Sequence, residues 1–150
     1  MSTGIDFEQL LQPARWYAYC VDRREFSMLP DIFAPEATLV VASVDPRAPP
    51  LLHLEGFRQI SDALHAIDIY PRTFHMLGQQ LVLDYRVDTA TTETYCRASH
   101  FYTRNDAQHE YVMYIRYRDE LLRKPDGGWQ FGSRHLHLDA ELGIPLIPRR

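Results

Sequence analysis

The fold is decided by residues 89–123, TATTETYCRASHFYTRNDAQHEYVMYIRYRDELLR, which contain two long runs of alternating side-chain character. Such alternation is typical of β-strands that turn one face to a core and the other to solvent. The pair Asn105-Asp106 between the two runs has a composition that favours a tight hairpin turn. The stretch therefore predicts two antiparallel strands, at residues 89–103 and 110–123.

The same alternation continues on both sides of this hairpin. Residues 73–85 precede it and residues 129–139 follow it, with turn residues at 87–88 and 124–128. Consecutive strands joined by short turns pair in antiparallel fashion. On the two central strands, the face expected to line the interior consists of Thr94, Cys96, Ala98, His100, Tyr111, Met113, Ile115 and Tyr117. Arg116 and Arg118 then point outward, whereas a β-bulge in this strand would reverse the alternation and turn Arg116 instead of Tyr117 to the pocket.

The first half of the chain carries helical patterns instead. Apolar residues three and four positions apart predict helices at 13–25 and 56–67, and a short helix at 26–32. A run rich in β-branched residues predicts a strand at 37–44. Helices followed by long antiparallel strands define the α+β class. We expect one domain, residues 1–150, in which a strongly curved, mostly antiparallel sheet folds over the helices as a cone that holds a small molecule.

Composition narrows the classes of function. The 16 Lys and Arg are scattered among 20 Asp and Glu, for a net charge of −4, so the basic face of a nucleic-acid binder is missing. The longest apolar stretch, residues 37–44, is far below the ~18 residues that span a bilayer, and residues 1–9 lack the pattern of a secretory signal. Cys20 and Cys96 have no paired spacing and are expected to be free thiols. We therefore expect a cytoplasmic protein whose partner is a small molecule, not a nucleic acid or a membrane.

Self-association is expected as well. The segment 142–148 is too apolar to lie free in water, and an open curved sheet leaves an apolar outer surface. These features predict a homo-oligomer, either a dimer or a trimer.

Asp22 and His75 are the candidate catalytic residues. Asp22 follows an apolar stretch of the first helix. His75 has the parity of Leu77, Leu81 and Leu83, which places it on an apolar face of the strand at 73–85. Together they offer an imidazole base and a carboxylate that fixes its tautomer. We predict that the two side chains are in hydrogen-bond contact at the floor of an enclosed cavity. His100 is a candidate second imidazole of this pocket, and Arg134 is a candidate partner for a buried carboxylate or for the substrate.

The order of several short motifs resembles a known family. These are the segments 17–26 (YAYCVDRREF), 32–39 (IFAPEATL), 55–56 (EG), 73–75 (TFH) and 126–131 (DGGWQF), followed by Arg134. Together they resemble the SnoaL-like branch of the nuclear transport factor 2-like superfamily over residues 8–139. Within this branch the chain is most similar to scytalone dehydratase and hexachlorocyclohexane dehydrochlorinase, with Asp22 and His75 at the positions of their Asp and His.

The resemblance implies a cone-shaped α+β barrel and a cofactor-free elimination, in which the histidine removes a proton and a neighbouring group leaves. His100 and Arg134 match pocket residues of these two enzymes. Tyr17 stands where the dehydrochlorinase has a lysine, and Tyr17 or Tyr19 is a candidate hydroxyl donor. With Cys96 and Tyr117 of the interior face, these residues form the expected substrate-binding set.

Three alternatives remain open from the sequence. An isomerase of the ketosteroid type would use the same base. A metal enzyme is suggested by His135-Leu-His137 followed by Asp139 and Glu141, since histidines at i and i+2 of a strand face the same way. A non-catalytic module, binding a small molecule or serving as a dioxygenase small subunit, is the third. The leading hypothesis is a cofactor-independent, dehydratase-like lyase, with no metal or nucleotide, acting on a small hydrophobic cyclic or aromatic substrate.

Overall fold

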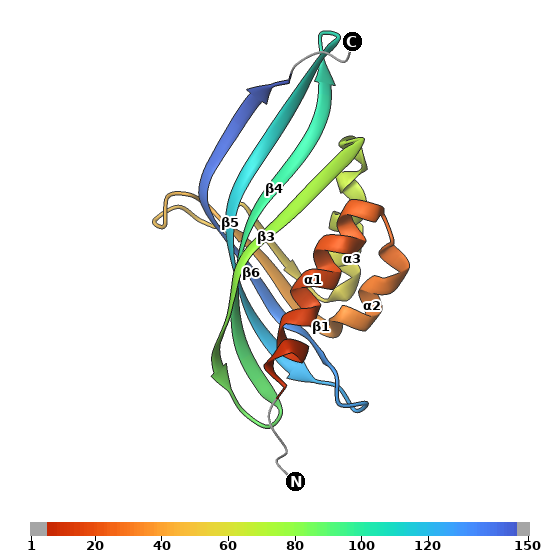
Figure 1. Cartoon of the computed structure of the whole chain (residues 1–150), viewed down its shortest axis with the longest axis vertical. Helices are drawn as coiled ribbons and strands as arrows, with labels where there is room; N and C mark the ends of the chain where they lie inside the picture. Colours follow the sequence, from red (N-terminus) through yellow and green to blue (C-terminus); the bar gives the residue numbers. More distant parts are fainter. Residues whose placement is uncertain (1–5, 147–150) are drawn as a thin grey trace.

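The computed structural model describes residues 6–146 and is organised around one six-stranded sheet with the order β2-β1-β6-β5-β4-β3. The strands are β1 (Phe33–Ala42), β2 (Leu52–Glu55), β3 (Arg72–Tyr85), β4 (Thr89–Arg104), β5 (Ala107–Arg123) and β6 (Trp129–Pro145). All neighbours pair antiparallel except β1 and β6, which run parallel. The sheet is long and strongly bent, and the helices lie together on one side of it (Figure 1). The expected α+β cone is confirmed.

The helical layer consists of α1 (Phe7–Arg23), a 3-10 turn at Phe26–Met28, α2 (Leu29–Ile32), α3 (Phe57–His65) and a second 3-10 turn at Ala66–Ile69. Helix α1 starts six residues earlier than the predicted 13, because Asp6 caps it by accepting a hydrogen bond from the backbone of Glu8. Pro13 therefore lies inside the helix, where it is buried. None of the described helices is long and apolar enough to cross a membrane.

Strands β4 and β5 pair with each other without interruption. Their register runs unbroken from Thr89 opposite Leu122 to Arg104 opposite Ala107. The turn between them places Asn105 and Asp106 at positive φ, which is the geometry that this residue pair favours. Because the register of this pair does not slip, the predicted interior residues of β4 are buried, as are Ile115 and Tyr117 of β5, while Arg116 pairs with Asp139 near the outer surface. Toward the start of β5 the predicted Tyr111 and Met113 are only half-buried, and Glu110 and Val112 are buried instead.

Other strands depart from the pattern. The alternation of β3 predicts that Leu81 shares the face of His75. This is wrong, because the strand has register shifts between Leu77 and Gln80 and between Val82 and Asp84. Strand β1 begins at Phe33, four residues before the predicted position, and carries a register shift around Pro35. Strand β6 extends to Pro145, beyond the predicted 139, and takes up part of the apolar segment 142–148. Residues 147 and 148 of that segment lie outside the described residues.

The core fills the space between the sheet and the helices. Its most deeply buried apolar side chains come from every layer: Leu10, Val21, Leu29, Phe33, Ile60, Leu121 and Phe131. The two cysteines, Cys20 and Cys96, are buried free thiols. Helix α1 packs on β3 at one side of this core, and that contact carries the candidate site.

Candidate active site

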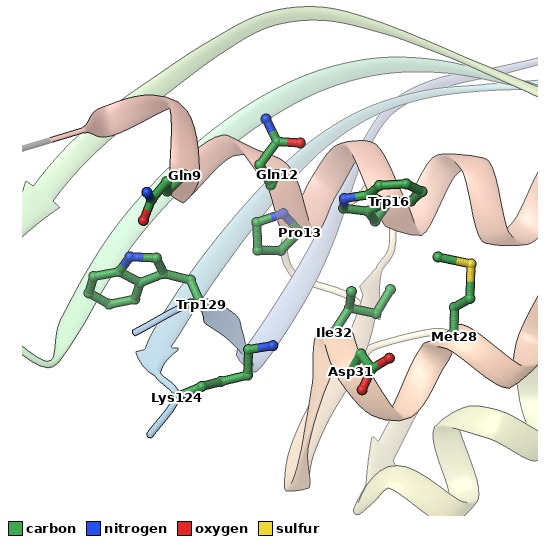
Figure 2. Close-up of a pocket in the computed structure, with 10 residues that line it drawn as sticks. Gln9, Gln12, Pro13, Trp16, Met28, Asp31, Ile32, Lys124 and Trp129 are labelled. Carbon is green, nitrogen blue, oxygen red and sulfur yellow. The ribbon is translucent and has the colours of Figure 1, made fainter. Parts of the chain in front are cut away.

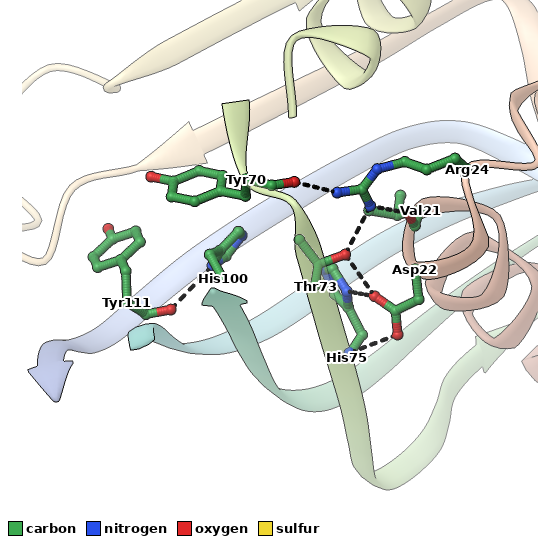
Figure 3. Close-up of polar contacts among 8 residues, drawn as sticks. All are labelled: Val21, Asp22, Arg24, Tyr70, Thr73, His75, His100 and Tyr111. Carbon is green, nitrogen blue, oxygen red and sulfur yellow. Dashed lines mark hydrogen bonds and ion pairs between the residues drawn. The ribbon is translucent and has the colours of Figure 1, made fainter. Parts of the chain in front are cut away.

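Asp22, near the end of α1, and His75, on β3, lie in direct contact (Figure 3). The imidazole Nδ1 of His75 is 2.7 Å from Asp22 Oδ1. The backbone N–H of His75 donates to Asp22 Oδ2 at 2.8 Å. Both side chains are shielded from solvent, with exposures of 5% for His75 and 20% for Asp22. The predicted hydrogen-bond contact is confirmed.

The protonation of Asp22 follows from its partners. Partial burial raises the pKa of the Asp22 carboxyl, but the hydrogen bonds and charge of His75 and the hydroxyl of Thr73 outweigh it, so the pKa lies below its ordinary value. An ionised carboxylate can only accept hydrogen bonds, so the proton of a neutral His75 sits on Nδ1. The Nε2 lone pair is then free to take a proton from a substrate.

Thr73 and Arg24 complete the surroundings of Asp22, and neither was predicted as a site residue. The Thr73 hydroxyl donates to Asp22 Oδ1 at 2.9 Å, and the guanidinium of Arg24 donates to Thr73 Oγ1 at 2.9 Å. The alternation of β3 could have identified Thr73, which shares the parity of His75. Arg24 could not be identified in this way, because its backbone has the left-handed conformation, with φ of 59°, that caps α1.

His100 lies one strand further into the sheet, on β4. Its ring centroid is 6.2 Å from that of His75, and its Nδ1 is 3.2 Å from the backbone carbonyl of Tyr111. The pKa of His100 is lowered to about 4, mainly by burial and in part by the nearby His75 and Arg24, against the hydrogen bond to the Tyr111 carbonyl and the charge of Asp22. His100 is therefore neutral at physiological pH and acts as a hydrogen-bonding group, not as a cation.

A recess of about 470 Å³ opens to the surface beside the rings that pack on His100, although His100 itself is not part of its lining. Ile69, Tyr70, Tyr102, Thr103 and Tyr111 line it. Two of these rings also pack on His100, with centroids at 4.9 Å for Tyr70 and 5.5 Å for Tyr111. The recess is open to solvent, and its lining does not include Asp22 or His75, so it does not match the enclosed floor that the sequence suggested.

A cluster of aromatic and charged side chains lies deeper in the cone. The guanidinium of Arg134 is fully buried and stacks on three rings, with its Cζ 4.2 Å from the centroid of Tyr17, 3.7 Å from that of Tyr117 and 4.5 Å from that of Phe131. The ring of Tyr17 in turn lies 6.3 Å from that of His75, at 90°. Tyr17 thus connects the buried arginine with the Asp22–His75 pair.

Asp119 is the buried carboxylate that pairs with Arg134. The two residues are directly opposite on β5 and β6, and Arg134 Nε is 3.2 Å from Asp119 Oδ1. The geometry of this contact is not that of a hydrogen bond. Within the described residues, no hydrogen bond is made by the Asp119 oxygens, the guanidinium nitrogens of Arg134 or the Tyr117 hydroxyl. The ion pair therefore leaves donors of Arg134 free. Asp119 was not predicted as a site residue because its neighbours in the sequence are charged. It lies two positions after Tyr117 on the same strand, and this spacing could have placed it on the interior face.

Burial controls the protonation of this cluster. It raises the pKa of Tyr17 to about 12 and that of the Cys96 thiol to about 12, with Arg134 opposing both shifts. It also raises the pKa of Asp119, again against Arg134. The Tyr17 hydroxyl and the Cys96 thiol therefore keep their protons at neutral pH, and both can donate but neither is a nucleophile.

Tyr19 is not part of the site. It is 45% exposed and packs edge-to-face on Trp16, on the outer side of α1. The expectation that Tyr19 lines the pocket is wrong, because the face of α1 that is buried carries Tyr17 and Val21. On that outer side a separate recess of about 350 Å³ is lined by Trp16, Asp31, Lys124 and Trp129 among others (Figure 2). His75 is not part of its lining.

The metal hypothesis finds no support in the part of the chain that the structure describes. There, no group of three or more His, Cys, Asp and Glu side chains is arranged to hold a metal ion. Of the four residues that suggested one, Asp139 pairs with Arg116 and Glu141 accepts a hydrogen bond from the Tyr111 hydroxyl.

The bent sheet, the helical cover and the inward-facing polar residues define the α+β cone of the nuclear transport factor 2-like superfamily. The chain matches the SnoaL-like domain over residues 6–135, so it belongs to that family. No curated protein matches the chain significantly.

Solved structures with the same fold come from several proteins. A provisionally named scytalone dehydratase from Novosphingobium aromaticivorans is 19% identical, with a TM-score of 0.77 over 97% of this chain and 90% of its own. A hexachlorocyclohexane dehydrochlorinase from Novosphingobium barchaimii is 14% identical, with a TM-score of 0.76 over 95% and 94%. The β subunit of a provisionally named aromatic-ring-hydroxylating dioxygenase from N. aromaticivorans is 18% identical, with a TM-score of 0.72 over 89% and 88%. At these identities the likeness establishes the fold alone.

Proposed function

We propose that this protein is a cofactor-independent lyase of the dehydratase type that acts on a small, hydrophobic, cyclic or aromatic substrate. The observation that carries this proposal is the contact of Asp22 with both the ring Nδ1 and the backbone N–H of His75. This arrangement leaves Nε2 as the base. The fold shared with a provisionally named dehydratase and with a dehydrochlorinase supports the reaction class.

In the proposed reaction, Nε2 of His75 takes a proton from a substrate carbon next to an electron-withdrawing group. The electron pair of the broken C–H bond forms a C=C bond, and a hydroxide leaves from the neighbouring carbon with its own bonding pair. The imidazolium returns its proton to the departing hydroxide, so that water is released. Asp22 stabilises the imidazolium between these two transfers.

Charge that develops on a substrate oxygen needs donors inside the cone. Tyr17 keeps its proton at neutral pH, and Arg134 has guanidinium donors without hydrogen-bond partners among the described residues. Neutral His100 donates from Nδ1 to the Tyr111 carbonyl, so its Nε2 is an acceptor for a substrate hydroxyl. We assign Tyr17 and Arg134 to the developing oxyanion, His100 to a substrate hydroxyl, and Cys96 and Tyr117 to the wall of the substrate site.

The test is a screen of cyclic ketones, phenols and hydroxylated aromatics in deuterated water. A lyase releases water and forms a C=C bond, whereas an isomerase of the ketosteroid type moves a proton between carbons and loses no group. Both reactions require His75, so the variant His75→Gln is the control. Exchange at carbon that persists in this variant would exclude His75 as the base.

A non-catalytic role as a dioxygenase small subunit is the second candidate, and the shared fold with such a β subunit favours it. It predicts co-purification with a larger oxygenase subunit and no turnover by the isolated chain. The buried Asp22–His75 pair weighs against it, because a structural subunit needs neither the inward base nor its carboxylate.

We also propose that the chain forms a homo-oligomer through the outer face of the sheet. Large apolar side chains are exposed there, including Phe74 and Met76 on β3 and Leu142 on β6. An exposed apolar patch of this kind is typical of a subunit contact. Sedimentation at high concentration tests this proposal, and a strictly monomeric profile would contradict it.

A further inference from the structure

We propose that Arg24 is a positioning residue of the active site, which acts through the Thr73 hydroxyl to hold Asp22 and to keep the proton of His75 on Nδ1. This inference rests on the proposed role of His75 as a base. It assigns a function to two residues, Arg24 and Thr73, that take no part in the reaction described above.

The direction of the hydrogen bonds follows from the chemistry of the two end groups. Thr73 Oγ1 lies 2.9 Å from Arg24 Nη1 and 2.9 Å from Asp22 Oδ1. A guanidinium only donates hydrogen bonds, and an ionised carboxylate only accepts them. The hydroxyl must therefore accept from Arg24 and give its single proton to Asp22. The chain Arg24 to Thr73 to Asp22 has only one possible polarity.

This polarity extends to the imidazole. Asp22 Oδ1 accepts from the Thr73 hydroxyl and lies 2.7 Å from His75 Nδ1, while Oδ2 accepts from the His75 backbone. Three bonds from two residues leave the carboxylate little freedom to rotate. With the Thr73 hydroxyl committed as a donor, Asp22 stays an acceptor toward Nδ1, and the neutral ring presents the lone pair of Nε2.

Arg24 is itself fixed from several sides (Figure 3). Its guanidinium donates to the backbone carbonyls of Val21 and Tyr70, the latter at 2.8 Å, and pairs with Asp68 at 3.0 Å. Four of its five N–H donors are thus used. These bonds join the end of α1 to the segment that leads into β3, which are the two elements that carry Asp22 and His75.

Among the described residues, the ion pair of Arg24 is with Asp68 and not with Asp22, so the guanidinium reaches the catalytic carboxylate through Thr73. The Asp68 side chain is 66% exposed, and an exposed pair of this kind contributes little. Asp68→Asn is therefore a matched control, since it removes a bond of Arg24 without touching the path to Asp22.

The experiment measures the tautomer of His75 by ¹⁵N NMR of labelled histidine, with the His75→Gln variant to assign the signal. We expect the Nδ1–H form in the wild type and in Thr73→Ser, which keeps the hydroxyl. Thr73→Val keeps the volume but loses the hydroxyl, and Arg24→Gln loses the charge. In both of these we expect a mixture of tautomers and a loss of turnover on the order of 10-fold.

A further readout separates positioning from a purely structural role. Because Arg24 acts through Thr73, the double variant Arg24→Gln/Thr73→Val should be no worse in turnover than the more impaired single variant. Asp68→Asn should leave the tautomer and the turnover unchanged.

The proposal is overturned if Arg24→Gln lowers only the melting temperature, with the tautomer as in the wild type, or if the two losses in turnover add. Because the tautomer is read without substrate, it also separates this proposal from the lyase proposal. If the variants change the tautomer as expected but the protein turns over no substrate, the positioning role is supported and the lyase proposal is rejected. Turnover that needs His75 but is insensitive to Thr73→Val and Arg24→Gln removes the positioning role alone.

Discussion

His75 contacts Asp22 twice, with its backbone N–H on one carboxylate oxygen at 2.8 Å and its ring Nδ1 on the other at 2.7 Å. A side chain held only through its ring could turn about its bond to the backbone. Here the same carboxylate fixes the backbone and the imidazole together. Asp22 therefore sets the position of the ring as well as its tautomer.

Replacing either member of this pair should abolish most of the activity on any substrate found by the exchange screen. His75→Gln removes the base and should lower turnover by about 10²–10⁴. Asp22→Asn should also lower it, because an amide can donate to Nδ1 and favour the wrong tautomer. Steady-state kinetics measure both effects. His135→Gln, a histidine on the far side of the sheet, is the matched control, and equal losses in all three variants would argue against a specific role of the pair.

His100 should make the protein less stable in mild acid. Its pKa is lowered from 6.5 to about 4 in the folded state, so below pH 6.5 the unfolded chain takes up a proton that the folded one does not. Stability is full above pH 6.5 and falls toward pH 4, by on the order of 3 kcal/mol from this group.

Urea unfolding at several pH values measures this dependence, with His100→Gln as the comparison. The variant should lose less stability than the wild type between pH 7 and 4.5. Asp22 loses its own contribution to stability at low pH in both proteins. The difference between the two slopes of unfolding free energy against pH is therefore due to His100. Identical slopes would mean that His100 is not buried as a neutral imidazole.

Sequence alternation identified the parts of the site that lie on uninterrupted strands. The interior faces of β4 and of the latter part of β5 could be predicted because the register of this pair has no shift, which places His100 and Tyr117 correctly. The face of Leu81 on β3 could not, because a bulge that reverses the parity has no clear signature in the residues themselves. Strand β2 was missed because it is four residues long and mostly exposed.

Helix ends were the other source of error. The N-cap of Asp6 allows α1 to include Pro13, where the sequence pattern suggested a new start. At the other end, the left-handed Arg24 turns its side chain back toward β3. From sequence, a charged residue that follows a helix is expected to face solvent. Only the tertiary contacts could show that Arg24 lies beside Thr73.

Tyr17 should be the hydroxyl donor of the proposed site. Tyr17→Phe removes one oxygen atom from a buried ring whose pKa is raised to about 12, so the lost group is a neutral donor. If it stabilises a developing oxyanion, turnover should fall by about 10²–10³ while KM changes little. Tyr19→Phe, on the exposed side of the same helix, should have no effect. Normal turnover by Tyr17→Phe would leave Arg134 as the donor to the oxyanion.

The effects of replacing Asp119 and Arg134 on stability should be strongly coupled, and the two single replacements should have unequal costs. Asp119→Leu leaves an unpaired guanidinium in the core, which cannot lose its proton and should cost about 3–5 kcal/mol. Arg134→Met leaves a carboxyl that can become neutral by taking up a proton, which its raised pKa already favours. The cost of Arg134→Met should therefore be smaller, and smaller at pH 5 than at pH 7, because a raised folded-state pKa adds stability that is lost as pH rises.

Urea unfolding of both single variants and of Asp119→Leu/Arg134→Met completes the cycle. The double variant should be less destabilised than the sum of the single variants, since it leaves no unpaired charge among the rings of Tyr17, Tyr117 and Phe131. The two residues face each other on β5 and β6, so any coupling is direct. Additive losses, or a greater cost for Arg134→Met than for Asp119→Leu at pH 5, would show that an unpaired buried charge is not the source of these costs.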